Sequence, residues 1–110
     1  GHISVTYRGQ VTSLHGYWDS KIFAKNYPNS FRDMAYLADN ASRKEFKEIT
    51  KGDVFDWAGR SAEKCWPLHN TWKDGDTIHS TYHLEMRQTA LDQLRDAGYR
   101  LATVMNGIFR

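Results

Sequence analysis

Apolar residues recur at intervals of three, four or seven along the C-terminal third of the chain. Such intervals place side chains on one face of an α-helix. They predict a long helix from about Thr81 to Gly107 that buries this face and forms the spine of the fold. The positions on the face are Leu84, Leu91, Leu94, Gly98, Leu101, Ala102 and Met105.

Residues that cap helix N-termini precede three shorter segments with helical periodicity. Ser30 opens one segment, whose inner face is Met34, Leu37 and Ala38. Ser42 and Glu45 form a capping box at the start of the next.

Asp53 is the third of these caps, and it predicts a helix from about Val54 to Cys65. The buried positions expected in this helix are Val54, Trp57, Ala58, Ala62 and Cys65. Residues 66–76 include Pro67 and Gly75 and predict a loop, with Trp66 and Trp72 packed against the domain.

The N-terminal residues Ile3 to Tyr7 alternate apolar and polar side chains, as a half-buried β-strand does. Residues 8–10 predict a turn, and Ser13 can cap a first helix from about Leu14 to Ala24. No other stretch predicts a strand, so this one is expected to lack a pairing partner within the chain. The expected fold class is mainly α, a helical bundle with one short N-terminal strand.

The composition suits one small globular unit. The chain has 110 residues, of which 40% are hydrophobic, which excludes a disordered composition. The net charge of +2 is too small to indicate nucleic-acid binding by itself. No apolar run is long enough to predict a membrane span. The single cysteine, Cys65, excludes an internal disulfide.

His15 and Asp19 are four residues apart in the first predicted helix. Helical geometry places them on one face, with Cβ atoms about 5–6 Å apart. An imidazole nitrogen and a carboxylate oxygen can then bind the same zinc ion, at roughly 2.0–2.2 Å each. The spacing occurs by chance in many helices, so a solvated pair is the competing interpretation.

The letters around this pair, Ser-Leu-His-Gly-Tyr-Trp-Asp-Ser at residues 13–20, carry more information than the spacing. They resemble the Asn-Leu-His-x-x-Trp-Asp segment of the S1/P1 type of zinc-dependent single-strand nuclease and 3′-nucleotidase, which includes mung bean nuclease. Residues 97–102 with Met105 and Asn106 resemble the Ala-Gly-x-Arg-Leu-Ala-x-x-Leu-Asn ending of the same family. Between the two blocks the resemblance is weaker, and Arg60 stands where the family has an acidic residue.

The resemblance implies a helical fold of the phospholipase C and P1 nuclease type. It implies that His15 and Asp19 bind one zinc of a cluster of about three ions. The implied reaction is hydrolysis of single-stranded RNA and DNA to 5′-nucleotides, with 3′-nucleotidase activity. Ser20 lies where relatives use a polar residue, often Asn, to contact the base. A secreted, periplasmic or cell-surface location is also implied.

Relatives carry an Asp-x-Gly-Gly-Asn stretch before such a strand, and this sequence does not have it. Residues 1–110 are therefore expected to form the C-terminal part of a larger nuclease domain. The remaining zinc ligands would come from the N-terminal part of the same protein, either in the same polypeptide or as a separate chain.

His79 and His83 form a competing metal pair, since both are imidazoles four residues apart, and His69 could add a third ligand. The family gives these positions no metal role, which favours ordinary surface histidines. Two other functions stay open, a zinc phospholipase C-like lipid phosphodiesterase and a non-catalytic helical interaction module.

Overall fold

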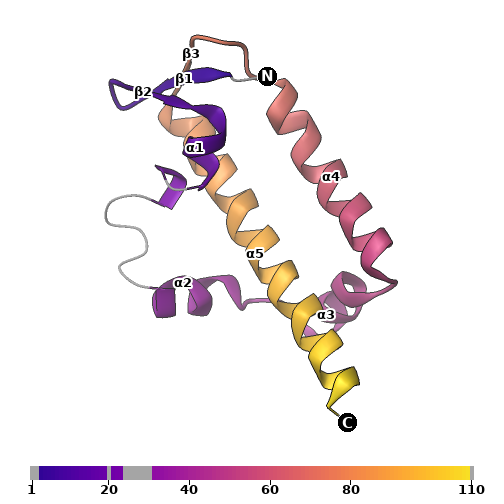
Figure 1. Cartoon of the computed structure of the whole chain (residues 1–110). Coiled ribbons are helices and arrows are strands. Elements are labelled where there is room, and N and C mark those ends of the chain that lie inside the picture. Colours follow the sequence, from indigo (N-terminus) through magenta and orange to yellow (C-terminus); the bar gives the residue numbers. More distant parts are fainter. Residues whose placement is uncertain (1–2, 20, 24–30, 110) are drawn as a thin grey trace.

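The computed structural model describes residues 3–19, 21–23 and 31–109 of the chain, and its architecture is mainly helical (Figure 1). The N-terminal elements are strands β1 (Ser4–Tyr7) and β2 (Gln10–Ser13), helix α1 (Leu14–Asp19) and the 3-10 turn η1 (Lys21–Phe23). They are followed by helices α2 (Phe31–Ala38), α3 (Arg43–Thr50) and α4 (Val54–Asn70), strand β3 (Asp76–Ile78) and helix α5 (Ser80–Ile108). The expected fold class is confirmed. Among the residues described, no helix combines the length and the apolar character needed to cross a membrane.

Strand β1 lies at the centre of a three-stranded sheet, so the prediction that it has no partner in the chain is wrong. It pairs antiparallel with β2 and parallel with β3, in the order β2-β1-β3. The turn between β1 and β2 places Arg8 and Gly9 at φ values of 52° and 77°, a conformation that suits a tight hairpin. Strand β3 has three residues and lies about 70 positions from β1, so no local sequence pattern predicts that the two strands pair.

The capped starts of α3 and α4 are as predicted. The Ser42 hydroxyl accepts a hydrogen bond from the Glu45 N–H at 3.2 Å, and the Asp53 carboxylate accepts one from the Asp56 N–H at 3.0 Å. Each cap is half of a reciprocal capping box. Helix α2 starts at Phe31 as expected, whereas the proposed cap Ser30 lies outside the described residues.

Two helix ends differ from the prediction. Helix α4 continues past Cys65 to Asn70, with Pro67 inside it, so the predicted loop begins five residues too early. Proline removes one helical hydrogen bond but does not force the end of a helix. Helix α1 stops at Asp19, and the stretch up to Phe23 includes a separate 3-10 turn. Ala24 lies outside the described residues.

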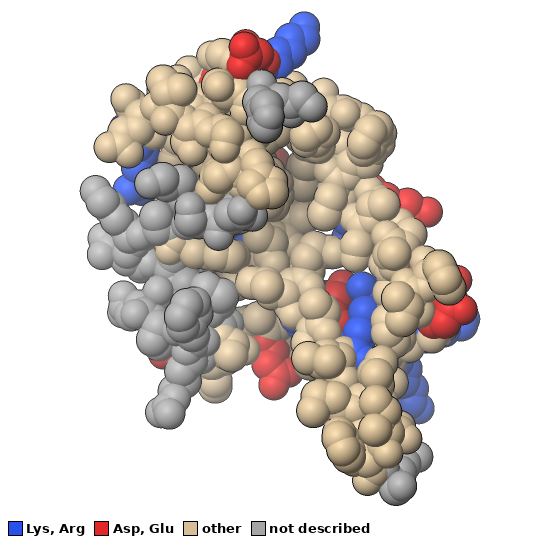
Figure 2. Space-filling view, viewed as in Figure 1, with Lys and Arg blue, Asp and Glu red and all other residues tan. Residues whose placement is uncertain are grey.

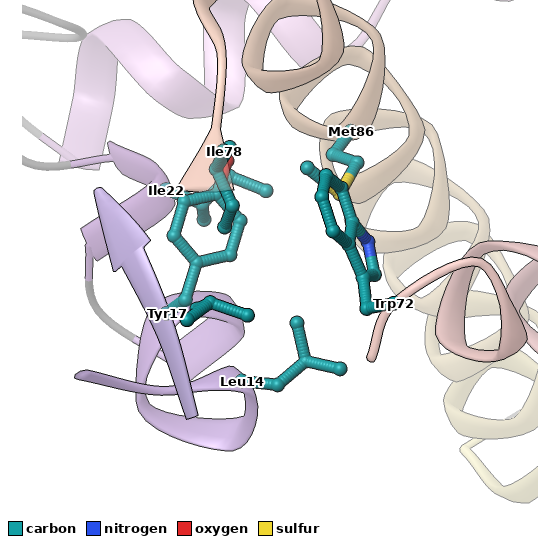
Figure 3. Close-up of a cluster of buried hydrophobic side chains, with 7 residues drawn as sticks. Leu14, Tyr17, Ile22, Trp72, Ile78 and Met86 are labelled. Atoms are coloured by element: carbon teal, nitrogen blue, oxygen red, sulfur yellow. The ribbon is translucent and has the colours of Figure 1, made fainter. Parts of the chain in front are cut away.

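The hydrophobic core lies between the sheet, α1 and the N-terminal part of α5 (Figure 3). Tyr17 is fully buried within it, and Trp72 packs there as predicted. The remaining core residues are Val5, Leu14, Ile22, Ile78 and Met86. This core holds α1 against α5.

The second half of α5 is less buried than its periodicity predicts. Leu91 is buried, with 3% of its surface exposed, whereas Leu101 is 60% exposed. Leu84, Leu94 and Met105 are also exposed. The expectation of a continuous buried stripe is therefore wrong, because the described elements beside this face leave its side chains largely exposed.

Helix α4 is also more exposed than predicted. None of its residues, all of which are described, is buried, so the predicted burial of Val54, Trp57, Ala58, Ala62 and Cys65 is wrong. Trp57 is half-buried. Trp66 is 65% exposed and does not pack against the domain as expected.

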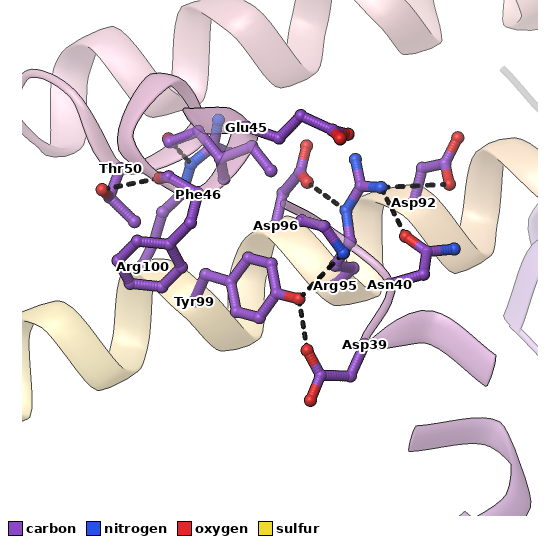
Figure 4. A network of polar contacts seen from close by, with 12 residues as sticks. Asp39, Asn40, Glu45, Phe46, Thr50, Asp92, Arg95, Asp96, Tyr99 and Arg100 are labelled. Atoms are coloured by element: carbon purple, nitrogen blue, oxygen red, sulfur yellow. Dashed lines mark hydrogen bonds and ion pairs between the residues drawn. The ribbon is translucent and has the colours of Figure 1, made fainter. Parts of the chain in front are cut away.

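Polar contacts rather than a large apolar core join α3 and the α2–α3 connection to α5 (Figure 4). Arg95 donates a hydrogen bond to the Asn40 side chain, the Tyr99 hydroxyl donates to Asp39, and Arg100 donates to the Ile49 carbonyl.

Arg60, which replaces an acidic residue of the family pattern, holds the C-terminal end of α3. Its guanidinium donates to the carbonyl oxygens of Glu48, Ile49 and Lys51 at 2.6–3.3 Å. A positive side chain is favourable at a helix C-terminus, where unpaired carbonyls gather. An acidic residue could not make these contacts, so this departure from the family has a local structural role.

Candidate metal centre

The start of α1 is fixed from two sides, which positions His15. The Leu14 N–H donates to the Ile3 carbonyl at 2.7 Å and so ties the helix to the residue before β1. The Ser13 hydroxyl accepts from the Gly16 N–H at 2.9 Å, as the predicted cap requires. A Cβ at Gly16 would lie 3.0 Å from that hydroxyl oxygen, so glycine lets the cap close tightly.

His15 is exposed in the first turn of α1 and lines a pocket of about 400 Å³. The other residues around this pocket are Ile3, Ser13, Leu14, Trp18, Cys65 and His69. The pocket therefore lies between α1 and the last turns of α4. An exposed imidazole beside a pocket is accessible to an ion from solvent.

Asp19 is the last residue of α1, one helical turn beyond His15 on the same face. Its side chain and the whole of Ser20 lie outside what the structure describes. Within the described residues, no three His, Cys, Asp or Glu side chains come together as a metal site. The assignment of His15 and Asp19 as a zinc pair thus stays a prediction.

The competing histidines are dispersed. His79 is exposed and occupies the N-cap position of α5, while His69 lies on α4 and shares the pocket of His15. His83 is buried, with 8% of its surface exposed, so its interpretation as a surface histidine is wrong. A metal ion at His83 would have to displace a tyrosine from one of its ring nitrogens.

Two tyrosine hydroxyls contact the two ring nitrogens of His83. The Tyr17 oxygen lies 2.6 Å from Nδ1, and the Tyr7 oxygen lies 3.2 Å from Nε2. The Tyr7 ring also stacks on the imidazole, with centroids 4.8 Å apart. We name these three residues the Tyr–His–Tyr cluster.

The sequence pattern did not predict the Tyr–His–Tyr cluster, although helical geometry indicates that Tyr17 faces away from His15. Tyr17 is two residues from His15, and therefore about 200° around the helix from it. The side of α1 that faces away from His15 is consequently the side that packs into the core. Tyr7 and His83 come from β1 and α5, and only the tertiary fold brings them to Tyr17.

Burial favours the uncharged forms of His83 and Tyr17. Burial lowers the pKa of His83 below its usual 6.5, and the positive charges of Arg87 and Arg8 lower it further. Burial also raises the pKa of Tyr17, with Tyr7 as a second cause. A neutral imidazole has one N–H and one bare nitrogen, so one tyrosine donates to His83 while the other accepts from it.

The lowered pKa of His83 predicts that the chain loses stability in mild acid. Below about pH 6.5 the unfolded chain binds a proton at His83 that the folded chain does not bind until its own, lower pKa is reached. The free energy of unfolding should therefore fall as the pH drops from 6.5, by at most about 1.4 kcal/mol per pH unit from this group.

Urea unfolding between pH 7.5 and 5, followed by tryptophan fluorescence, measures this slope. The variant His83→Gln should have a shallower slope than the wild-type chain, and His79→Gln on the same helix should not change it. Equal slopes in the wild type and His83→Gln would contradict the assignment.

Comparison with known proteins places the chain in a family. The profile described as S1/P1 Nuclease matches residues 1–110, the whole chain. Neither the search of curated proteins nor the search of solved structures found a match. A match over the full length agrees with the resemblance of the His15 segment and of the last helix. The chain therefore belongs to the S1/P1 nuclease family, a family of hydrolytic nucleases.

Proposed function

We propose that this chain carries part of the active site of a zinc-dependent nuclease and that His15 and Asp19 bind one zinc ion. The supporting observation is the exposed His15 at a pocket, one helical turn from Asp19, in a member of the S1/P1 nuclease family. The proposed reaction is hydrolysis of phosphodiester bonds in single-stranded RNA and DNA to 5′-nucleotides. Removal of the phosphate from 3′-nucleotides is the proposed second activity.

The donor set suits zinc. Imidazole nitrogen and carboxylate oxygen are both common zinc ligands, and His15 and Asp19 lie four residues apart in α1. When bound, zinc supplies Lewis-acid stabilisation of phosphoryl oxygens and activates water near neutral pH. Ser20, directly after Asp19, is the proposed contact to the base, and its hydroxyl makes fewer hydrogen bonds than the amide of Asn.

A single strand is the proposed substrate because its bases are unstacked and its backbone can bend toward a recessed site. In duplex nucleic acid the bases are stacked and paired, so a base cannot enter a pocket without an energetic cost. The mild net charge of +2 agrees with recognition at a local site rather than along an extended basic surface.

The remaining zinc ligands are proposed to come from the N-terminal part of the same protein, either in one polypeptide with this chain or as a separate chain of the functional assembly. A catalytic zinc needs about three protein ligands, and this chain assigns two. The proposed cluster of about three ions therefore needs residues beyond those of this chain.

The exposed apolar side chains of α4 and α5 support the same proposal. Leu101, Val104, Ile108 and Phe109 are all exposed near the end of α5, and Phe55 on α4 is 87% exposed. Figure 2 shows mostly uncharged side chains over the C-terminal part of α5, with charged side chains beside it. Large apolar side chains left exposed at one end of a molecule are typical of an interface. Secretion or a periplasmic or cell-surface location is proposed from the family.

Metal analysis and cleavage assays on the purified chain test these proposals. We expect bound zinc that a chelator removes. In the complete assembly we expect zinc-dependent cleavage of single-stranded oligonucleotides and no comparable cleavage of a duplex of the same sequence. A chain without affinity for zinc would contradict the assignment, and release of lipid products instead of nucleotides would favour the phospholipase. Full zinc content and activity in the isolated monomer would contradict the need for a partner segment.

A further inference from the structure

Helix α1 is too short to fix its own position. It has six residues, and isolated helices below about 12–15 residues are marginal in water. Its orientation must therefore come from the contacts that its buried side makes with other elements. Any displacement of α1 would move His15 and Asp19 together, because both belong to the same turn and a half of helix.

Within the described residues, the buried side of α1 contacts α5 through the Tyr–His–Tyr cluster. Tyr17 is 0% exposed, and its hydroxyl oxygen lies 2.6 Å from Nδ1 of His83. The neighbouring apolar residues Leu14, Ile22 and Met86 pack closely but without directional preference (Figure 3). A hydrogen bond depends on distance and angle, so it can fix the rotation of α1 about its axis.

The second tyrosine extends the contact to the sheet. Tyr7 on β1 contacts Nε2 of His83 at 3.2 Å, and its ring meets the Tyr17 ring edge-on with centroids 5.3 Å apart. One imidazole thereby links β1, α1 and α5. Among the residues described, no buried polar side-chain atom lacks a hydrogen-bond partner, so the cluster is fully satisfied.

We propose that His83 is a positioning residue for the zinc site, which holds α1 through Tyr17 so that His15 and Asp19 face the metal together. This inference rests on the proposed function. The hydrogen bonds of the cluster join Tyr7, Tyr17 and His83 to one another. The cluster therefore acts on metal affinity through the orientation of α1.

The first test is the substitution Tyr17→Phe, which keeps the ring and removes only the hydroxyl. Groups that orient metal ligands typically change metal affinity by about 10–100-fold, so a rise of about tenfold or more in the Kd for Zn²⁺ is expected. Isothermal titration with Zn²⁺ measures it, on protein shown to be folded by circular dichroism. Tyr82→Phe, at the exposed tyrosine beside His83, is the matched control and should leave the Kd unchanged.

Two substitutions at His83 separate positioning from packing. His83→Phe fills the space without a hydrogen bond and should weaken Zn²⁺ binding as Tyr17→Phe does. His83→Gln, whose amide can donate and accept, should retain more of the affinity. In the Co²⁺-loaded chain, the intensity of the visible absorption should differ from that of the wild type in His83→Phe and recover toward it in His83→Gln.

Amide hydrogen exchange in the metal-free chain gives a reading that does not depend on the metal. We expect faster exchange in residues 14–19 of Tyr17→Phe than in the wild type, with little change in the second half of α5. If the Tyr17 and His83 variants fail to fold, Tyr7→Phe removes the longer contact alone and should show the same changes in smaller size.

The outcomes distinguish this inference from the proposed function. The positioning role is overturned if Tyr17→Phe and His83→Phe fold and their Kd for Zn²⁺ stays within twofold of the wild-type value. If His15→Ala fails to bind Zn²⁺ in the same experiment, the proposed zinc site still stands. A wild-type chain that binds no Zn²⁺ would overturn both. Equal loss of affinity in His83→Phe and His83→Gln would show that a hydrogen-bonding side chain at this position does not restore the zinc site, and would also overturn the inference.

Discussion

Replacing His15 with alanine is expected to raise the Kd of the chain for Zn²⁺ by about 100-fold or more. The substitution removes one of the two proposed ligands, and even groups that only orient a ligand change metal affinity by about 10–100-fold. His15 is exposed in the first turn of α1, so its loss should leave the core intact. In any form of the protein that cleaves single-stranded DNA, the same change should abolish cleavage.

Competition with a chromophoric chelator measures the Kd, and urea unfolding checks that stability is unchanged. His69→Ala is the matched control, because it removes an exposed histidine from the same pocket. Zinc affinity should survive that change. The prediction is contradicted if His15→Ala keeps its affinity for Zn²⁺ and His69→Ala or His79→Ala loses it. The metal site would then be assigned to the competing histidines.

The candidate zinc pair could be proposed from the sequence because the pattern that suggests it is local. The spacing of His15 and Asp19, the Ser13 cap and the surrounding aromatic residues all fall within nine positions. Local patterns of this kind survive folding because helix geometry alone fixes them. The Tyr–His–Tyr cluster could not be located in the same way, since Tyr7, Tyr17 and His83 are brought together by sheet pairing and by the packing of α1 on α5.

The same division explains the fold. The caps at Ser42 and Asp53 and the extent of α5 follow from rules about neighbouring residues, and the structure confirms them. The pairing of β1 with β3 joins segments about 70 residues apart. Hydrophobic periodicity describes neighbouring residues only, so it cannot predict this pairing. Periodicity also marks which face of a helix is apolar but not whether another element covers that face.

The two halves of α5 differ in whether another element covers their apolar face. Its N-terminal half packs on the sheet and α1, and Met86 there is fully buried. Its C-terminal half carries an equally apolar stripe that the described residues leave exposed. An exposed stripe contributes little to the stability of this chain, and it is the surface that we propose to pack against the N-terminal part of the nuclease.

Two leucines of the same helix therefore predict opposite results. Leu91→Ala should lower the free energy of unfolding by about 2–5 kcal/mol, because it removes a side chain that is 3% exposed and leaves a cavity. Leu101→Ala should change it by less than about 0.5 kcal/mol, because Leu101 is 60% exposed. Both substitutions replace leucine with alanine inside one helix, so the difference in helix propensity cancels between them.

Urea unfolding of the isolated chain measures both values, and Met86→Ala against Met105→Ala repeats the comparison with a second side chain. Met86 is 1% exposed and Met105 is 47% exposed, so the same order is expected. In the complete nuclease assembly, Leu101→Ala should become destabilising, because the exposed stripe is proposed to be buried there. A loss of 2 kcal/mol or more for Leu101→Ala in the isolated chain would contradict this prediction and show that the face is already buried. If a second copy of the chain buries it, the midpoint of urea unfolding will depend on protein concentration.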